Sequence, residues 1–345
     1  MKTSESPGQV TGGSIPSYVI GVDGGTTKTI AFVADLCGQI LGVARGTGSN
    51  ATGENVDEAM GVVVQTTREA LQKSGIMPQE ADLGMFTLAG ADWPEDIQRR
   101  QHVLEKAALA RKVIVKNDTF GGLRAGTRCP YGVVIAVGTG ANTAIITPSG
   151  QEWAYGYYQN YGGAFDFSRE AIEAVLRAED GRGAPTLLTE MVLGQLGFST
   201  VEEMLKALVA KEVGQASQLA LCPRVFEASF AGDEVASERI VRHGLALAEY
   251  AVAAIRRFQM TQEAFDVVLV GSVFKGPGSL LPDTITMAIH RVAPHACVVR
   301  SYFEPVIGAL LLAYDALGLP TSDAVYDCLE ATCPAAEFFN TDQGF

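Results

Sequence analysis

Apolar residues alternate with smaller or polar ones from Tyr18 to Gly42, in the stretch YVIGVDGGTTKTIAFVADLCGQILG. This period of two predicts a strand, a turn at Gly24-Gly25, a second strand over Ile30–Ala34, another turn and a third strand. The two glycines let the backbone turn tightly and approach a ligand closely. On the pattern alone, an ordinary hairpin and a ligand-binding turn both fit.

Segments with helical spacing alternate with short apolar strands after this hairpin. Apolar positions predict helices over Glu54–Ser74 and Pro94–Ala110. Short apolar runs predict strands over Leu83–Leu88 and Val113–Val115, and a short helix follows from Thr119. Such alternation implies crossover connections, so we expect a partly parallel sheet beside the antiparallel hairpins.

The opening pattern returns in the middle of the chain. Strands are predicted over Tyr131–Val137, Thr143–Thr147 and Gln151–Tyr157, and a glycine- and threonine-containing turn, Gly138 to Asn142, separates the first two. Two such units facing each other would place two phosphate-binding turns across one cleft. Chance similarity between two glycine-rich hairpins is the alternative.

A long helical region interrupts the second unit, and its clearest helix runs from Glu234 to Phe258. The chain then returns to a strand, Asp266–Val270, and ends its last strong helix near Leu317. We divide the chain into a disordered lead-in 1–16, an N-terminal domain 17–127 completed by the helix 304–319, a C-terminal domain 128–303 with a helical insertion 168–260, and a tail 320–345.

Composition narrows the class of protein. The chain has 345 residues, of which 47% are hydrophobic and 19% charged, which suits a soluble globular protein with ample core. Its net charge is −13 and no run of basic residues occurs, so we expect neither a nucleic acid nor a membrane as partner. The six cysteines form no Cys-x-x-Cys pair, which favours free thiols in the cytoplasm.

Common nucleotide and hydrolase motifs do not occur. The sequence has no Gly-x4-Gly-Lys-Ser/Thr loop, no Gly-x-Gly-x-x-Gly before a helix and no Gly-x-Ser-x-Gly elbow. Polar residues instead follow predicted strands at Asp23, Asp92 and Asp118, where α/β sheets place ligands. Because Asp92 and Asp118 also precede helices, each fits a helix cap equally well.

These segments, taken in order, carry a resemblance. Asp23 to Thr29 resembles the first phosphate motif of the actin, Hsp70 and sugar-kinase superfamily, and Asn117-Asp118 its connecting motif. Gly138-Thr139-Gly140 resembles the second phosphate motif and Gly271-Ser272 the adenosine motif. Over Tyr18 to Leu319 the chain is similar to the N-acetylglucosamine kinase and BadF/BadG/BcrA/BcrD-type ATPase family.

The resemblance implies an α/β, two-domain actin-like ATPase (ribonuclease H-like) fold. Each domain would hold a mixed five-stranded sheet flanked by helices, with the ATP cleft between the domains. It also implies an ATP-dependent sugar kinase, most simply for an amino sugar such as N-acetylglucosamine or glucosamine, and a homodimer. In this reading Asp118 is the general base of phosphoryl transfer, and Asp23 holds Mg²⁺ through water.

The same resemblance assigns the binding residues. The expected ATP-binding residues are Gly24, Gly25, Thr26, Thr27, Lys28, Gly138, Thr139, Gly140, Gly271 and Ser272. The expected sugar-binding residues are Asn50, Asp118, Asn142, Asn160 and Tyr161.

One segment departs from the family pattern. Where sugar kinases of the family carry Gly-Asp-Glu-Gly-Ser-Gly, this chain reads Gln159 to Ala164, QNYGGA, so both acids are absent. Asn160 keeps hydrogen-bonding capacity without charge, and we expect Tyr161 to stack on a sugar face. A nucleotide-binding sensor without kinase activity is therefore an alternative. An ATPase activator with a shared [4Fe–4S] cluster is another, although Cys129 stands alone near the domain junction.

Overall fold

The computed structural model describes residues 17–50 and 55–340. The predicted lead-in 1–16 and the last five residues of the tail lie outside the described residues. The strands are β1 Tyr18–Gly24, β2 Lys28–Asp35, β3 Ile40–Thr47, β4 Ala81–Leu88, β5 Lys112–Asn117, β6 Gly132–Val137, β7 Ala141–Ile146, β8 Glu152–Ala154, β9 Asp266–Val270 and β10 Cys297–Arg300. The helices are α1 Val56–Ser74, α2 Pro94–Ala107, α3 Asp118–Gly126, α4 Ala164–Glu179, α5 Leu188–Leu196, α6 Val201–Val209, α7 Gln215–Leu219, α8 Cys222–Phe230, α9 Glu234–Arg257, α10 Leu280–His290, α11 Pro305–Ala316 and α12 Asp323–Thr332.

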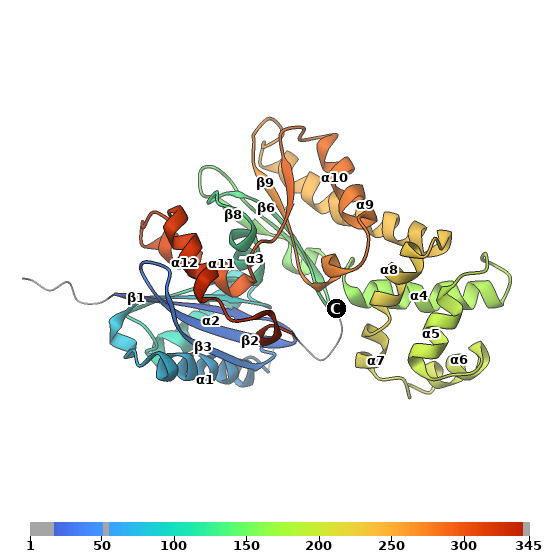
Figure 1. The fold of residues 1–345 in the computed structure, drawn as a ribbon, viewed down its shortest axis with the longest axis horizontal. Helices are drawn as coiled ribbons and strands as arrows, with labels where there is room; N and C mark the ends of the chain where they lie inside the picture. Colours follow the sequence, from blue (N-terminus) through green and yellow to red (C-terminus); the bar gives the residue numbers. More distant parts are fainter. Residues whose placement is uncertain (1–16, 51–54, 341–345) are drawn as a thin grey trace, which may run out of the picture.

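Two five-stranded sheets share one topology. The first has the order β3-β2-β1-β4-β5 and the second the order β10-β9-β6-β7-β8. In each sheet three antiparallel strands join two strands that run parallel to the first of them. Thus β6, β7 and β8 repeat β1, β2 and β3. The prediction of two mixed five-stranded sheets flanked by helices is confirmed (Figure 1).

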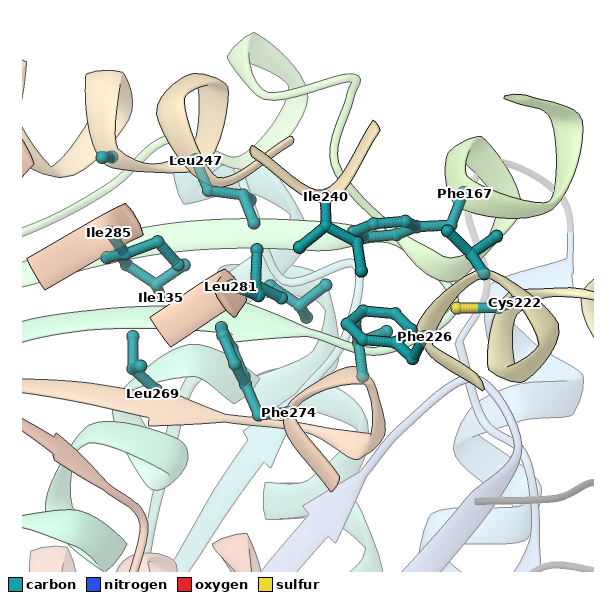
Figure 2. Packing of buried hydrophobic residues seen from close by; sticks show 14 of the residues in the cluster. Ile135, Phe167, Cys222, Phe226, Ile240, Leu247, Leu269, Phe274, Leu281 and Ile285 are labelled. Carbon is teal, nitrogen blue, oxygen red and sulfur yellow. The ribbon is translucent and has the colours of Figure 1, made fainter. Parts of the chain in front are cut away.

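Helices cover both sheets in layers. Apolar residues of α1 and α2 pack on one face of the first sheet, and α11 and α12 pack on its other face. Helices α9 and α10 cover the outer face of the second sheet, where Leu247 and Ile285 meet Ile135 and Leu269 (Figure 2). Helices α4 to α8 extend from the second sheet as a separate helical region (Figure 1).

Helices α3 and α11 cross between the two sheets with almost no side chain separating them. A Cβ atom built on Gly308 would lie 1.8 Å from the carbonyl oxygen of Gly121, so only glycine permits this approach. Helix α3 meets the second sheet through Gly122 and Gly126, which lie against Val270 and Val268. Helix α11 packs against β1, so each crossing helix covers the sheet of the other half.

Two predicted segments differ from the structure. The strand expected over Gln151–Tyr157 spans only Glu152–Ala154, because the chain turns into a short 3-10 helix at Gly156–Tyr158. The helical insertion predicted over 168–260 follows a helix that begins earlier, at Ala164. The Asp166 carboxylate accepts the amides of Gly162 and Gly163 there, and this local cap starts a helix that the glycines concealed.

Among the described residues no helix is both long and apolar enough to cross a membrane. All six cysteines lie within these residues, and each is free.

Replacing Gly308 with alanine is expected to destabilise the protein strongly. The new methyl group would force the two helices apart, so we expect the upper end of the ~1–3 kcal/mol cost of overpacking. Gly61→Ala is the matched control, because a Cβ at this helical position meets nothing within 4 Å and should gain up to about 1 kcal/mol of helix propensity. Urea denaturation of both variants measures the difference. Equal stabilities would disprove the tight crossing.

Candidate functional site at the ends of the strands

The turn between β1 and β2 is held by a second stretch of chain. Gly25 N donates to the Lys28 carbonyl at 2.9 Å, and Ser49 N donates to the Gly25 carbonyl at 2.9 Å. Asn50 Nδ2 donates to Thr26 Oγ1 at 3.1 Å. The two threonines at the tip of the turn remain exposed. Their hydroxyls and the backbone amides suit the oxygens of an anion such as a phosphate.

The equivalent turn between β6 and β7 faces the first one. Ala164 N, at the start of α4, donates to the Gly138 carbonyl at 2.8 Å and fixes this turn. Gly271 follows the neighbouring strand β9 with a φ of 113°, in the region that favours glycine. A Cβ there would lie 2.2 Å from the Val137 carbonyl oxygen. Only glycine can therefore bring the end of β9 against the second turn.

Two adjoining cavities lie along this edge of the sheets. The Ser272 cavity, of ≈ 410 Å³, has Lys28, Ser272, Lys275, Glu304 and Phe339 among its lining residues. The Asp118 cavity, of ≈ 400 Å³, has Thr26, Asn50, Asp92, Asp118, Asn142, Gln159 and Asn160 among its lining residues. Both are also lined by Asp23, Thr27, Gly138, Thr139, Val270, Gly271 and Pro305. They therefore form two ends of one cleft with the turns at its middle.

Two carboxylates in this cleft hold protons more tightly than exposed ones. Burial, and then the charge on Asp118, raise the pKa of Asp23 to about 7. Burial and the charge on Asp92 likewise raise the pKa of Asp118 to about 7. The side chain of Asp118 is only half-buried, because it opens on the cavity. Carboxyl groups with such values change protonation near neutral pH, which suits proton transfer.

Asn117 connects the two halves of the site. Its Nδ2 donates at 2.7 Å to Asp92 Oδ1, in the loop that follows β4. Its Oδ1 accepts from Asn142 Nδ2, on β7 of the second sheet, at 3.2 Å. The same oxygen accepts from Thr119 N at 3.1 Å and so caps α3. Asn117 thereby fixes the position of Asp118, the first residue of that helix.

Neither Asp92 nor Asn117 was predicted to be a functional residue. Asp92 was noted after a strand but also fitted a helix cap, and Asn117 was noted only in the resemblance to the connecting motif. Burial raises the pKa of Asp92, while the hydrogen bond from Asn117 lowers it. The only sequence signal for a functional role of these two residues was their position after strands. Their contact with each other follows only from the parallel pairing of β4 with β5.

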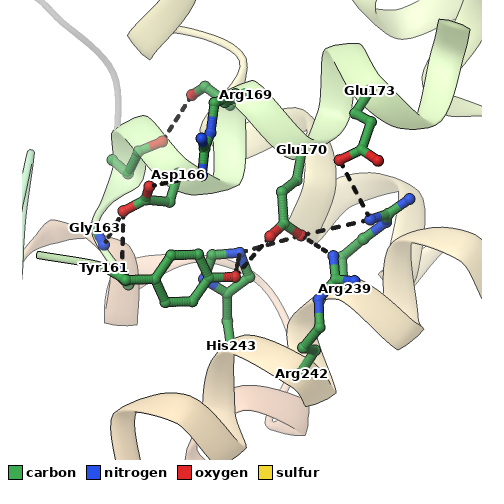
Figure 3. Close-up of polar contacts among 12 residues, drawn as sticks. Tyr161, Gly163, Asp166, Arg169, Glu170, Glu173, Arg239, Arg242 and His243 are labelled. Atoms are coloured by element: carbon green, nitrogen blue, oxygen red, sulfur yellow. Dashed lines mark hydrogen bonds and ion pairs between the residues drawn. The ribbon is translucent and has the colours of Figure 1, made fainter.

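The predicted sugar-binding residues separate in the structure. Asn50, Asn142 and Asn160 line the Asp118 cavity together with Asp118 itself. Tyr161 does not line it. Its ring stacks on His243 at 4.7 Å between centroids, and its hydroxyl donates to Glu170 at 2.6 Å (Figure 3). The ring therefore holds the loop and is not placed to stack on a ligand in the cavity.

Most of the predicted nucleotide-binding residues line the cleft. Thr26, Gly25 and Gly140 line the Asp118 cavity, Lys28 and Ser272 the other, and the shared residues lie between them. Gly24 lines neither cavity. Lys28 Nζ donates to the Phe339 carbonyl at 2.5 Å and lies 3.9 Å from the Glu304 carboxylate. The C-terminal segment thus borders the cleft beside the first turn.

A larger hollow of ≈ 940 Å³ lies in the helical region, away from the strand ends. Its arginines are already engaged, because Arg242 binds Glu170 and Arg239 lies 3.8 Å from Glu170 and 3.9 Å from Glu173 (Figure 3). The strand-end aspartates do not reach it. The cleft is therefore the better candidate for the functional site.

Two sheets of the same topology, joined by crossed helices and carrying a glycine turn each on one shared cleft, define a two-domain ATPase of the actin-like fold. The chain belongs to the BadF/BadG/BcrA/BcrD ATPase family, whose model matches residues 20–313.

The individual relatives of the chain share only low sequence identity with it. The chain is 26% identical over 311 residues to an N-acetyl-D-glucosamine kinase of Dictyostelium discoideum, across 85% of this chain and 97% of that protein. It is 24% identical over 301 residues to an N-acetylmuramic acid/N-acetylglucosamine kinase of Clostridium acetobutylicum, across 86% and 98%. A solved structure from Chromobacterium violaceum, described as a candidate N-acetylglucosamine kinase, superposes with a TM-score of 0.66 at 23% identity, across 86% and 98%. That likeness supports the fold.

Replacing Asp23 with asparagine is expected to stabilise the ligand-free protein more at pH 8 than at pH 5. A carboxyl whose pKa rises from an ordinary 3.8 to about 7 on folding costs stability as the pH rises through that window, by about 1.4 kcal/mol for each unit. Asparagine carries no charge at either pH. Urea denaturation at the two pH values measures the difference.

Asp327→Asn is the matched control, because it removes a carboxylate that is exposed rather than buried. A stability change for Asp23→Asn that is the same at pH 5 and pH 8 would contradict the buried charge.

Proposed function

We propose that this protein transfers the γ-phosphate of ATP to a hydroxyl of a sugar, most simply an amino sugar such as N-acetylglucosamine or glucosamine. The observation that carries the proposal is that Asp118 lines the same cavity as Thr27, Gly138 and Thr139. A carboxylate and two phosphate-binding turns thus face one space. Membership of an ATPase family and similarity to sugar kinases over nearly the whole chain support it.

Phosphoryl transfer depends mainly on positioning and on neutralising charge, with one carboxylate orienting the nucleophile. In the proposed reaction the sugar occupies the Asp118 cavity, and ionised Asp118 accepts the proton of the attacking hydroxyl. Asn117 holds Asp118 at the start of α3. Because Asn117 also bonds Asp92 and Asn142, the base is fixed relative to both halves of the cleft.

The nucleotide is assigned to the other end of the cleft. Gly271 and Ser272 offer backbone against which an adenosine can lie in the Ser272 cavity, and the two turns meet the phosphates where the cavities join. Lys28 lies at this junction, although its ammonium is already bonded to Phe339. A role for Lys28 in phosphate binding stays a prediction.

Magnesium fits the chemistry of Asp23. No group of the described residues donates a hydrogen bond to its buried carboxylate, and no cluster of three metal-binding side chains occurs in residues 17–50 and 55–340. Mg²⁺ is often held by one or two carboxylates, water and substrate phosphates. Asp23 would hold such an ion, which would neutralise charge on the phosphates. Dimerisation stays a prediction from the resemblance, and a cytoplasmic location stays a prediction from the pattern of cysteines.

Replacing Asp118 with asparagine should lower sugar phosphorylation by at least about 10³-fold, because the amide cannot accept the proton. ATP binding should persist, since the turns and Ser272 are untouched. A coupled ADP-release assay over amino sugars, N-acetylated sugars and neutral polyols measures turnover, and calorimetry measures ATP binding. Asp327→Asn is the control.

Near-normal turnover of the Asp118→Asn variant would show that another group is the base. A wild-type protein that binds ATP and phosphorylates none of these acceptors would favour the nucleotide sensor instead.

Activity should rise with pH across the range in which Asp118 ionises. Its pKa of about 7 leaves the carboxyl protonated and unable to act as a base at pH 5, and ionised at pH 8. We therefore expect kcat/KM for the sugar to fall about tenfold for each unit below that pKa. Steady-state rates at saturating ATP measure this, with ATP affinity determined at each pH as the control. A flat profile from pH 5 to 8 would rule out Asp118 as the titrating base.

A further inference from the structure

The side chain of Gln159 is buried without a hydrogen-bond partner. It is 6% exposed, and neither Oε1 nor Nε2 meets a donor or acceptor among the described residues. Leaving a buried amide unpaired costs about 1–3 kcal/mol, so native proteins rarely keep one without a reason. Gln159 also lines the Asp118 cavity. A ligand in the cavity can supply the missing partner once the amide, whose atoms are now covered, turns toward it.

The loop around Gln159 is anchored on both sides. Gln159 N donates to the Gly156 carbonyl at 3.0 Å, and Gly156 N donates to Asn142 Oδ1 at 3.0 Å. Two residues beyond Gln159, the Tyr161 hydroxyl binds Glu170 and lies 3.0 Å from His243 Nε2 (Figure 3). Such anchoring fixes the backbone of the loop before a ligand arrives, which reduces the entropy cost of binding.

The network behind Tyr161 is itself strongly held. Burial alone would raise the pKa of Glu170, but hydrogen bonds from His243, Tyr161 and Arg242 lower it to about 2. Glu170 is therefore ionised at neutral pH and holds the Tyr161 hydroxyl as a donor. The loop has no free charge of its own to offer the cavity. Recognition from this side then falls to Gln159 and to the exposed Tyr157 and Asn160.

The charges of the Asp118 cavity limit what it can bind. Its described lining residues include Asp23, Asp92 and Asp118 but no lysine or arginine. Like charges at short range disfavour a ligand that carries a carboxylate or phosphate on its sugar ring. An uncharged sugar or a cationic amino sugar meets no such barrier.

A primary carboxamide offers two N–H donors and one carbonyl acceptor side by side. Two neighbouring hydroxyl groups match it, because one accepts from Nε2 while the other donates to Oε1. We propose that Gln159 determines acceptor specificity by binding a pair of adjacent hydroxyls on an uncharged or amino sugar. This inference rests on the proposed function, and it assigns the recognition to a residue that the family pattern occupies with glycine.

The test compares Gln159→Leu with wild type on a sugar acceptor and on its monodeoxy analogues. We expect the variant to raise the KM for the sugar by about ten- to a hundredfold and to leave the KM for ATP unchanged. Removing either bound hydroxyl from the sugar should weaken sugar binding strongly in wild type and little in the variant. The reason is that the deoxy sugar and the substitution each remove the same hydrogen bond. The exposed Gln151→Leu in the same domain is the matched control.

The melting temperature distinguishes a ligand-binding role of Gln159 from a structural one. If Gln159 serves a ligand, Gln159→Leu should raise the melting temperature of the ligand-free protein, since an unpaired buried amide has been removed. A lower melting temperature together with equal deoxy penalties in variant and wild type would overturn the proposal.

Calorimetry with the same sugars distinguishes this inference from the proposed function. Wild type that binds a neutral sugar through Gln159 but releases no ADP would refute the kinase and support the binding role. Wild type that binds none of the neutral or amino sugars, or that binds a sugar acid as tightly as its uncharged counterpart, would refute the role assigned to Gln159.

Discussion

The close crossing of α3 and α11 is the constraint on which the molecule depends. Backbone touches backbone where Gly308 meets Gly121, and each helix then packs on the sheet of the opposite half. The two sheets are therefore held with the ends of their central strands facing one cleft. Any side chain at this contact would spread the sheets and separate the two turns that line the cleft.

Charge in the cleft opposes the stability that packing supplies. Burial is the main cause that raises the pKa values of Asp23 and Asp118 to about 7. Each carboxyl group therefore destabilises the ligand-free fold when it ionises. Ligands that neutralise or use these carboxylates remove that cost. The site is thus built for binding at the expense of stability, as is common for active sites. The hydrogen bonds of Asn117 partly offset this loss of stability, because they hold Asp92 and cap α3.

The residues of the segment that departs from the family pattern have different surroundings in the structure. Tyr161 faces away from the cavity and ties the loop to Glu170 and His243. Gln159, which was not among the predicted site residues, is buried at the wall of the Asp118 cavity with its amide unpaired. Two uncharged amides of this segment, Gln159 and Asn160, line the cavity instead of acidic residues.

Local sequence signals alone determined much of the secondary structure and the position of the ligand-binding edge. Alternating apolar residues and paired glycines specify the hairpins and their turns, and polar residues after strands indicate a ligand edge, because these signals act within a few residues. Tertiary structure alone decided that Asn117 joins Asp92 to Asn142 across the cleft, and that Gln159 is buried while Tyr161 turns away. Those outcomes depend on which distant strands and helices pack together, and that information is spread over the whole chain.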